Sequence, residues 1–145
     1  LEAEHKTVAN IKARKAFTLA VPGTDTLEAS DFLGIASANK MADKFQRTGL
    51  HAEKSQRVDA PVIEEYPLTL ECELVEMQDQ PYGLRVLGRI VNVLADEKVL
   101  DKAGKIDAGK LQTFAFDQMR HGYYAMGEKV GQAWHSGAGL MKQEG

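Results

Sequence analysis

The feature that most restricts the fold of this chain is a pair of long β-type segments in its middle, residues 67–74 and 83–95. In "PLTLECEL" (67–74), apolar and polar residues alternate, which predicts a strand with one face toward water. "GLRVLGRIVNVLA" (83–95) is apolar on both faces, so we expect it to lie at the centre of a sheet. Pro81 and Gly83 favour a hairpin between the two segments.

Shorter elements are predicted on both sides of this pair. In chain order they are the end of a strand at Leu1 to Ala3, a helix from His5 to Lys15, a strand at 16–21, a helix after Thr26, helical turns at 43–48 ended by Gly49, a polar surface crossing at 51–66, a turn at 101–107, a strand at 112–116 and a short helix at 128–140. Several strands with short helices between them predict a mainly β or α+β fold rather than a doubly wound sheet. The length favours a single domain over residues 1–145.

Composition and charge argue against several classes of function. A net charge of −3 disfavours a nucleic-acid binder that works through a broad basic surface. No apolar run reaches the roughly 20 residues of a membrane-spanning helix, and no signal-peptide pattern opens the chain, so we expect a cytoplasmic protein without membrane contacts. No GxGxxG, Walker, CxxC or HExxH motif is present, and no metal site is predicted.

Several single residues are interpreted as structural. Cys72 lies within an alternating strand and is expected to be a small buried hydrophobe. Trp134 is expected to anchor the last helix by packing, and His121, next to two tyrosines, is expected in a half-buried surface cluster. No serine has the sequence context of a nucleophile elbow, so no catalytic residue is assigned.

The start of the predicted helix at His5 is a candidate anion site. The free N–H groups of a first helical turn, together with the helix dipole, favour a phosphate by roughly 0.3–1 kcal/mol. Lys6 and Thr7 would add charge-assisted hydrogen bonds of about 1.5–3 kcal/mol each when shielded from water. The alternative for His5 is a solvated or capping side chain.

Six segments resemble one known family, in order from the first residue to about Leu140. They are "AEHKTVANI" (3–11), "AFTLAVP" (16–22), "DFLGIASANKMADKFQRTGL" (31–50), "VDAPVIEEYPLTLECEL" (58–74), "GRIVNVLADEKVL" (88–100) and "YYAMGEKVGQAW" (123–134). Together they resemble the flavin reductase-like family, the flavoredoxin-like FMN-binding split-barrel proteins. The resemblance implies a split β-barrel with short flanking helices, a homodimer, and an FMN in each subunit near the dimer interface.

The resemblance also implies which residues bind the cofactor. The family's phosphate-binding segment falls on His5, Lys6 and Thr7, with Asn10 one turn later, and a second family segment falls on Ser37, Asn39, Lys40 and Lys44. Lys40 or Lys44 would bring another positive charge to the phosphate, with a solvated helix face as the alternative for both. Tyr123, Tyr124 and Trp134 are candidates for contact with the flavin ring.

The function implied is that of an FMN-dependent oxidoreductase that takes electrons from NAD(P)H or a redox partner protein. A non-catalytic flavin-binding or electron-carrier protein of the same fold is the alternative, and a split barrel that binds haem or another ligand is a third. Family members carry further strands ahead of the "AEHKT" segment. We therefore expect this sequence to be part of a longer protein, and expect it alone to bind FMN poorly or to take strands from another chain.

Overall fold

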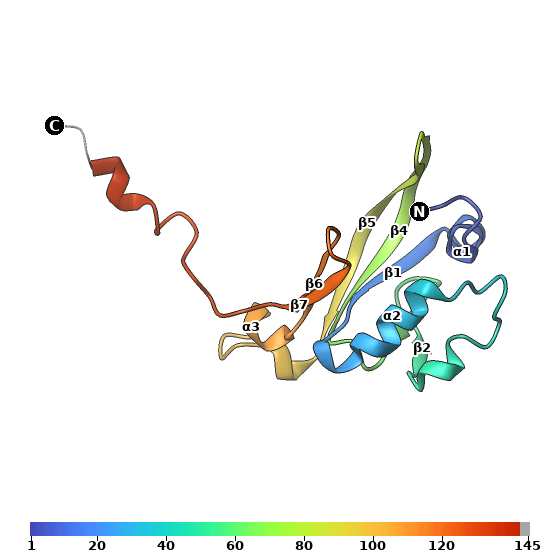
Figure 1. The fold of residues 1–145 in the computed structure, drawn as a ribbon, viewed down its shortest axis with the longest axis horizontal. Helices are drawn as coiled ribbons and strands as arrows, with labels where there is room; N and C mark the ends of the chain where they lie inside the picture. Colours follow the sequence, from blue (N-terminus) through green and yellow to red (C-terminus); the bar gives the residue numbers. More distant parts are fainter. Residues whose placement is uncertain (143–145) are drawn as a thin grey trace.

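The computed structural model describes residues 1–142, and its centre is a three-stranded antiparallel sheet. β4 (Leu68–Gln80) lies between β1 (Ala16–Val21) and β5 (Gly83–Ala95). β4 and β5 form the long twisted hairpin that dominates Figure 1. The predicted hairpin is confirmed, and the first strand continues six residues beyond the predicted end at residue 74, to Gln80.

The predicted central position of residues 83–95 is wrong. β5 lies at the edge of the sheet and the alternating strand β4 occupies the centre. β4 is central because it pairs with β1 on one side, from Ala16 opposite Glu73 to Val21 opposite Leu68, and with β5 on the other. The apolar residues of β5 therefore do not mark a strand covered on both faces, and several of them are exposed.

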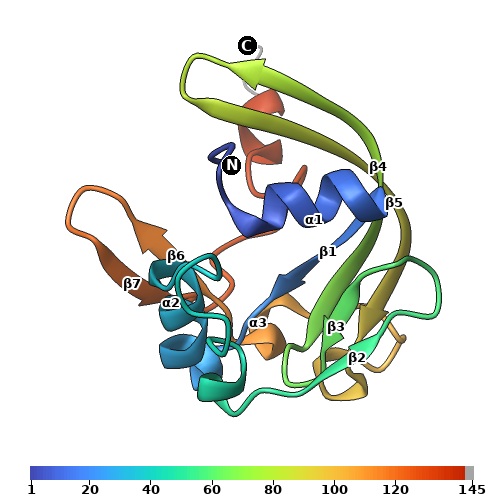
Figure 2. The same ribbon diagram turned by 90° about the vertical axis from the view of Figure 1, so that its right-hand side faces the viewer.

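Two α-helices accompany the first strand along the chain. α1 (Lys6–Arg14) begins after the N-cap His5 and ends at Lys15, which adopts a left-handed conformation with φ 57°. α2 (Leu27–Ile35) follows a short 3-10 turn, η1 (Thr24–Thr26). Both helices agree with the predicted positions, and Figure 2 shows α1 crossing the end of the sheet near β1.

The predicted irregular crossing at 51–66 contains a small second sheet. β2 (Ala52–Lys54) pairs with β3 (Pro61–Ile63) after a 3-10 turn, η2 (Gln46–Thr48), that ends at Gly49 with φ 71°. Pro61 is compatible with this assignment because it is the first residue of its strand, where no ladder N–H is required. Each strand has three residues, too few for a period-2 pattern to appear in the sequence.

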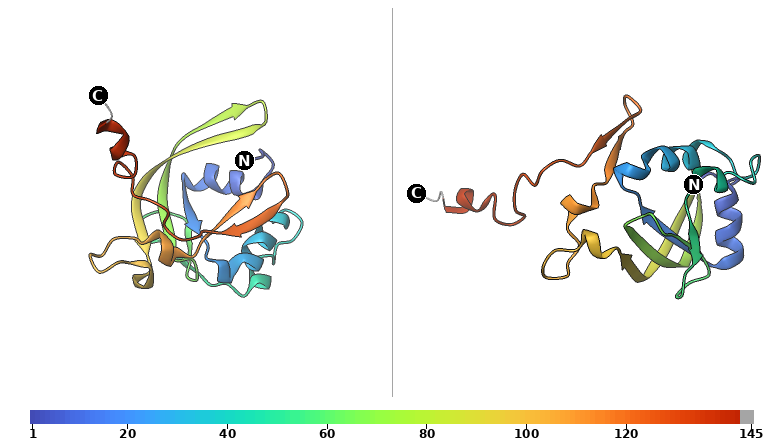
Figure 3. Two further views of the ribbon diagram at one scale, coloured as in Figure 1. Left: turned by 60° about the vertical axis from the view of Figure 1, so that its left-hand side comes forward. Right: turned by 90° about the horizontal axis from the view of Figure 1, so that it is seen from below.

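The chain after β5 contains a third sheet and an extended C-terminal segment. It passes through η3 (Glu97–Val99) and a short α3 (Ala108–Leu111) into β6 (Phe114–Asp117), which pairs with β7 (Gly122–Ala125). β6 agrees with the predicted strand, shifted by one or two residues, whereas α3 and β7 were not predicted. Figure 3 shows these elements beside the main sheet, and shows the chain that follows β7, as far as residue 142, leading away from it.

The predicted helix at 128–140 is wrong. Residues 126–137 contain turns and irregular backbone, and only a 3-10 segment, η4 (Ala138–Lys142), follows them. Trp134 does not anchor a helix, because its side chain is 94% exposed. Glycines at 127, 131, 137 and 139 weaken a helix here, and the segment buries no apolar face that would compensate for them.

The predicted strand end at Leu1 to Ala3 is also not formed. Leu1 instead exchanges two backbone hydrogen bonds with Leu84 of β5: the Leu1 amino group donates to the Leu84 carbonyl at 2.9 Å, and the Leu84 N–H donates back at 2.6 Å. A single residue pair of this kind is too short to count as a strand.

The apolar core lies mainly beneath α1 and along the middle of the sheet. Val8 and Ile11 of α1 are almost fully buried, as is Val99 after β5. Cys72 is buried as predicted, and burial raises the pKa of its thiol. In the part of the chain that the structure describes, every helix is too short or too polar to cross a lipid bilayer.

Candidate functional site

A groove of about 620 Å³ lies between α1, β1 and the β2–β3 hairpin. Three polar residues of α1 line it: Thr7, Asn10 and Arg14. Their spacing of three and four residues places them on one face of the helix. A volume of this size falls within the range of about 300–1,000 Å³ that is usual for small-molecule sites.

The start of α1 next to this groove retains free hydrogen-bond donors. The first helical hydrogen bond runs from the Val8 N–H to the His5 carbonyl at 2.9 Å, so the N–H groups of Lys6 and Thr7 precede it. The N-cap His5 makes no side-chain capping bond, and the first turn contains no acidic residue. The His5 ring lies 3.2 Å from the Glu2 carboxylate instead. This helix end therefore suits an anion.

The wall of the groove opposite α1 comes from the β2–β3 hairpin and carries both signs of charge. Arg14 donates to the Asp59 carboxylate at 2.9 Å, and Lys54 lies 3.8 Å from the same group. The hydrogen bond from Arg14 holds the pKa of Asp59 below its ordinary value. Asp59 thus contacts cations on both sides of the groove, and because Glu53 lines the groove as well, its two cationic and two acidic side chains balance in charge.

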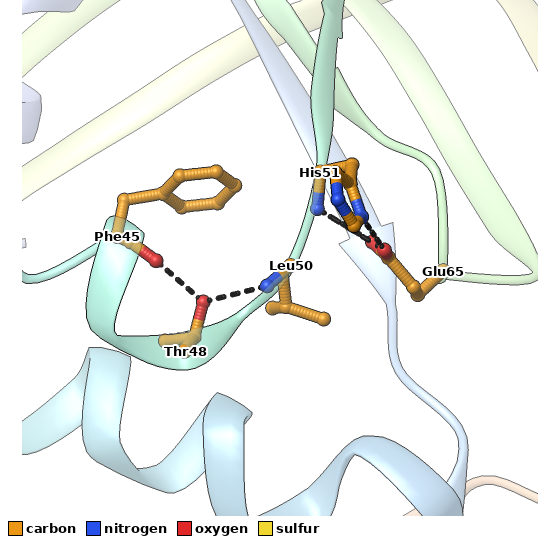
Figure 4. A network of polar contacts seen from close by, with 5 residues as sticks. All are labelled: Phe45, Thr48, Leu50, His51 and Glu65. Atoms are coloured by element: carbon orange, nitrogen blue, oxygen red, sulfur yellow. Dashed lines mark hydrogen bonds and ion pairs between the residues drawn. The ribbon is translucent and has the colours of Figure 1, made fainter.

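A polar contact holds the entry to β2. The His51 N–H donates to the Glu65 carboxylate at 3.0 Å, and the His51 ring nitrogen Nδ1 lies 2.6 Å from it (Figure 4). The hydrogen bond to Glu65 raises the pKa of His51. In the preceding turn, Thr48 Oγ1 donates to the Phe45 carbonyl and accepts from the Leu50 N–H. These bonds fix where the hairpin wall begins.

A buried polar cluster joins the same hairpin to the central strand. The Glu71 carboxylate on β4 is 1% exposed and accepts hydrogen bonds from the Ser55 hydroxyl and, at 2.5 Å, from the Asn92 amide. The Ser55 Oγ in turn accepts from the backbone N–H groups of Arg57 and Val58 at 3.0 and 2.9 Å. Ser55 therefore ties the turn between β2 and β3 to the middle of the main sheet.

The second predicted segment, residues 37–44, contacts the helix start at one point but does not line the groove. The Asn39 side chain donates to the Glu4 carbonyl at 2.8 Å, just before the N-cap of α1. Ser37 Oγ accepts from the Asn39 N–H at 3.3 Å, and Lys40 is exposed. The Lys44 ammonium donates to the Leu33 and Ala36 carbonyls, at 2.9 and 2.8 Å, and so caps the end of α2.

The predicted site residues therefore separate into groups. Thr7 and Asn10 line the groove, and His5 and Lys6 stand at the adjoining helix start. Asn39 reaches that start from the second segment. Ser37 and Lys40 do not line the groove, and Lys44 is engaged at the end of α2. Their contact with a phosphate stays a prediction. Four charged groove residues were not predicted: Arg14, Glu53, Lys54 and Asp59. The helical spacing from Thr7 through Asn10 would have reached Arg14, whereas the sequence holds no comparable signal for Lys54.

The aromatic candidates of the C-terminal part lie away from this groove. The Tyr123 hydroxyl donates to Asp31 of α2 at 2.6 Å, and that hydrogen bond raises the pKa of Tyr123. Its ring contacts Phe114 and Phe116 at centroid distances of 5.3 and 5.5 Å. His121 is exposed, not half-buried as expected, and its ring stacks on Phe116. None of these residues, nor Tyr124 or Trp134, lines the groove.

Comparisons with known proteins agree with this architecture. The family model of the flavin reductase like domain matches residues 1–115. Flavoredoxin of Desulfovibrio vulgaris (Miyazaki F) is 31% identical with a TM-score of 0.87, over 94% of this chain and 73% of that one. Flavoredoxin from Methanosarcina acetivorans is 25% identical with a TM-score of 0.88, over 97% of this chain and 74% of that one.

A third solved structure, a split barrel domain protein from Shewanella frigidimarina NCIMB 400, is 28% identical with a TM-score of 0.73, over 87% of this chain and 63% of that one. No curated protein sequence matches the chain significantly. The mostly antiparallel sheet with short helices is thus the architecture of split-barrel proteins, although the three sheets described here do not close into a barrel.

Proposed function

Since the chain belongs to the family of flavin reductase-like domains, we propose that it binds FMN and acts as an oxidoreductase, taking electrons from NAD(P)H or from a redox partner protein. The observation that carries this proposal is the groove beside the uncapped start of α1. FMN, when bound, supplies the hydride and electron chemistry, and the protein supplies position and electrostatics.

The residues around the groove fit a terminal monophosphate. The N–H groups of Lys6 and Thr7, the Lys6 ammonium and the Thr7 hydroxyl would hold the phosphate at the helix start. Asn10, one turn further, offers an amide to the hydroxyls of the ribityl chain. Arg14 is held at the far end of the same helix face by Asp59 and would remain in place when the ligand enters.

The cofactor proposed is FMN because this site would take a single terminal phosphate. Solved structures of similar fold include an FMN-binding domain from Shewanella baltica OS155 and an FMN-binding protein from Thermus thermophilus, which are 20% and 16% identical to this chain. We propose that the chain forms a homodimer and that Lys40 strengthens the positive potential near the phosphate. Lys44 would act on the site indirectly, through the end of α2.

The test is reconstitution of the purified chain with FMN, followed by addition of NADH or NADPH without oxygen. An oxidoreductase of this kind should show the visible absorption of a bound flavin, and that absorption should fall when the nucleotide is added. A bound flavin that neither nucleotide reduces, and that only a reduced redox protein reduces, would assign the chain as an electron carrier. A haem spectrum, or the absence of any flavin binding, would contradict the proposal.

A further inference from the structure

A second pocket, of about 410 Å³, adjoins the groove and shares Arg14, Ala16 and Asp59 with it. It lies where the end of α1 meets the turn between β2 and β3 and the middle of β4. Glu73 of β4 lines it and is two residues from the buried Glu71, so both residues point to the same face of the main sheet. The pocket is therefore on the polar face of the sheet, against which the β2–β3 turn is held.

The carboxylates of this pocket are already paired with cations. Asp59 accepts a hydrogen bond from Arg14 at 2.9 Å, and Glu73 accepts one at 2.5 Å from Arg89 of β5, which lies outside the pocket. The other two charged residues that line the pocket are Lys15 and Arg57. Within residues 1–142, their side chains form no ion pair and no hydrogen bond. The pocket thus carries two uncompensated cations, whereas the charges of the groove balance.

The two uncompensated cations extend from backbone that is fixed on both sides of the pocket. Lys15 ends α1 with φ 57°: its N–H donates to the Ile11 carbonyl, and its carbonyl accepts from the Leu74 N–H, both at 2.9 Å. The Arg57 N–H donates to the Ser55 hydroxyl oxygen at 3.0 Å, and that hydroxyl also belongs to the buried cluster on β4. An anion that enters between them therefore requires only side-chain ordering.

A guanidinium and an ammonium that face one pocket suit a phosphate monoester. Arginine binds phosphate oxygens in a bidentate manner, and lysine adds a point charge. The negative end of the α1 dipole is an alternative partner for Lys15, but it does not account for Arg57, which comes from the β2–β3 turn. The phosphate of FMN is assigned to the opposite end of α1, so this pocket would take a second phosphate group.

Resting on the function proposed above, in which a pyridine nucleotide supplies electrons, we propose that this pocket binds the 2′-phosphate of NADPH and makes NADPH rather than NADH the donor. The two nucleotides differ only in that phosphate, and dinucleotide-binding proteins commonly accommodate it with an arginine. A donor must lie beside the cofactor that it reduces. A phosphate pocket that shares residues with the proposed FMN groove meets this requirement.

The experiment titrates the full chain with adenosine 2′,5′-bisphosphate, 5′-AMP and inorganic phosphate by calorimetry, in the presence of saturating FMN and again without FMN. The first two probes differ only in the 2′-phosphate. With FMN present, we expect the bisphosphate to bind at least about tenfold more tightly than either of the other probes. The FMN-loaded chain should favour NADPH over NADH in kcat/KM by a similar factor.

Two variants and two controls locate the phosphate. Arg57→Gln and Lys15→Gln should each weaken binding of the bisphosphate about tenfold and leave that of 5′-AMP unchanged. Arg85→Gln and Lys12→Gln are the matched controls, because both residues are exposed, lie outside the pocket and lose the same charge. Circular dichroism checks that each variant is folded.

The outcomes separate this inference from the proposed function. Equal affinities for the bisphosphate and 5′-AMP, or equal losses in the variants and their controls, overturn the pocket as a 2′-phosphate site. Inorganic phosphate that binds as tightly as the bisphosphate, or equal kcat/KM for NADPH and NADH, overturns the assignment of the donor. Each of these results, with FMN bound, leaves the proposed function standing. A chain that binds no FMN but still selects the bisphosphate overturns the proposed function and supports the phosphate pocket.

Discussion

Replacing Lys6 by alanine should weaken the binding of FMN by about ten- to a hundredfold. The change removes one charge-assisted hydrogen bond to the phosphate, which contributes about 1.5–3 kcal/mol when it is shielded from water. The backbone donors at the start of α1 remain in the variant, so binding should be weakened rather than abolished. The dissociation constant of FMN is measured by titration, following the quenching of flavin fluorescence.

The matched control is Lys12→Ala. Lys12 is an exposed lysine on the same helix, but it lies in the last turn and outside the groove. Its removal changes the net charge of the chain by the same amount, so a general electrostatic effect would appear equally in both variants. An affinity that is unchanged in Lys6→Ala, or reduced equally in Lys12→Ala, would mean that the helix start does not hold the phosphate.

Replacing Ser55 by alanine should lower the free energy of unfolding by about 1.5–3 kcal/mol. Its hydroxyl donates to the buried Glu71 carboxylate and accepts from the N–H groups of Arg57 and Val58. Without it, the carboxylate keeps Asn92 as a hydrogen-bond donor, and two backbone donors lose their acceptor. Urea unfolding followed by circular dichroism measures the change.

Ser136→Ala provides the comparison for this change. Ser136 has the same hydroxyl, but it bonds only to Gln132, within an exposed segment, so its loss should change the free energy of unfolding by no more than about 0.5 kcal/mol. A Ser55→Ala variant as stable as Ser136→Ala would show that the buried cluster does not hold the hairpin. Because that hairpin forms one wall of the groove, Ser55→Ala should weaken FMN binding as well.

Local signals in the sequence were enough to predict α1, α2 and the β4–β5 hairpin. A helix start with its spacing of apolar residues, and a Pro and Gly between two apolar runs, act over a few neighbouring residues. The order of strands in the sheet is decided by contacts between distant residues. The sequence of an apolar strand such as β5 therefore predicts a central position in the sheet, although the strand lies at the sheet edge and several of its side chains are exposed to water.

The failed predictions have a common physical cause. The helix expected at 128–140 contains glycines at 131, 137 and 139, which weaken a helix, and such a segment becomes helical only where packing compensates for them. The described part of the chain offers these residues no such packing surface. β2 and β3 are held by pairing with each other and by Ser55, and neither strand is long enough to show a pattern. Both cases depend on contacts that the local sequence does not contain.

The candidate site was predicted in part for the same reason. Thr7 and Asn10 follow from the family resemblance, and their helical spacing extends to Arg14. Lys54 enters the groove from a hairpin that was not predicted, through its shared contact with Asp59. Lys44 was expected to bring positive charge to the phosphate, but its ammonium donates to two carbonyls at the end of α2. That contact depends on how the loop after α2 folds back onto the helix, which the local sequence does not show.

The central claim, that the groove beside α1 holds FMN by its phosphate, is tested most directly by titrating the unmodified chain with FMN and with riboflavin. The two ligands share the flavin ring and the ribityl chain and differ only in the phosphate. The phosphate site described here predicts that riboflavin binds at least about tenfold more weakly than FMN, since it forgoes the charge-assisted hydrogen bonds at the helix start. Equal dissociation constants for FMN and riboflavin would contradict the claim.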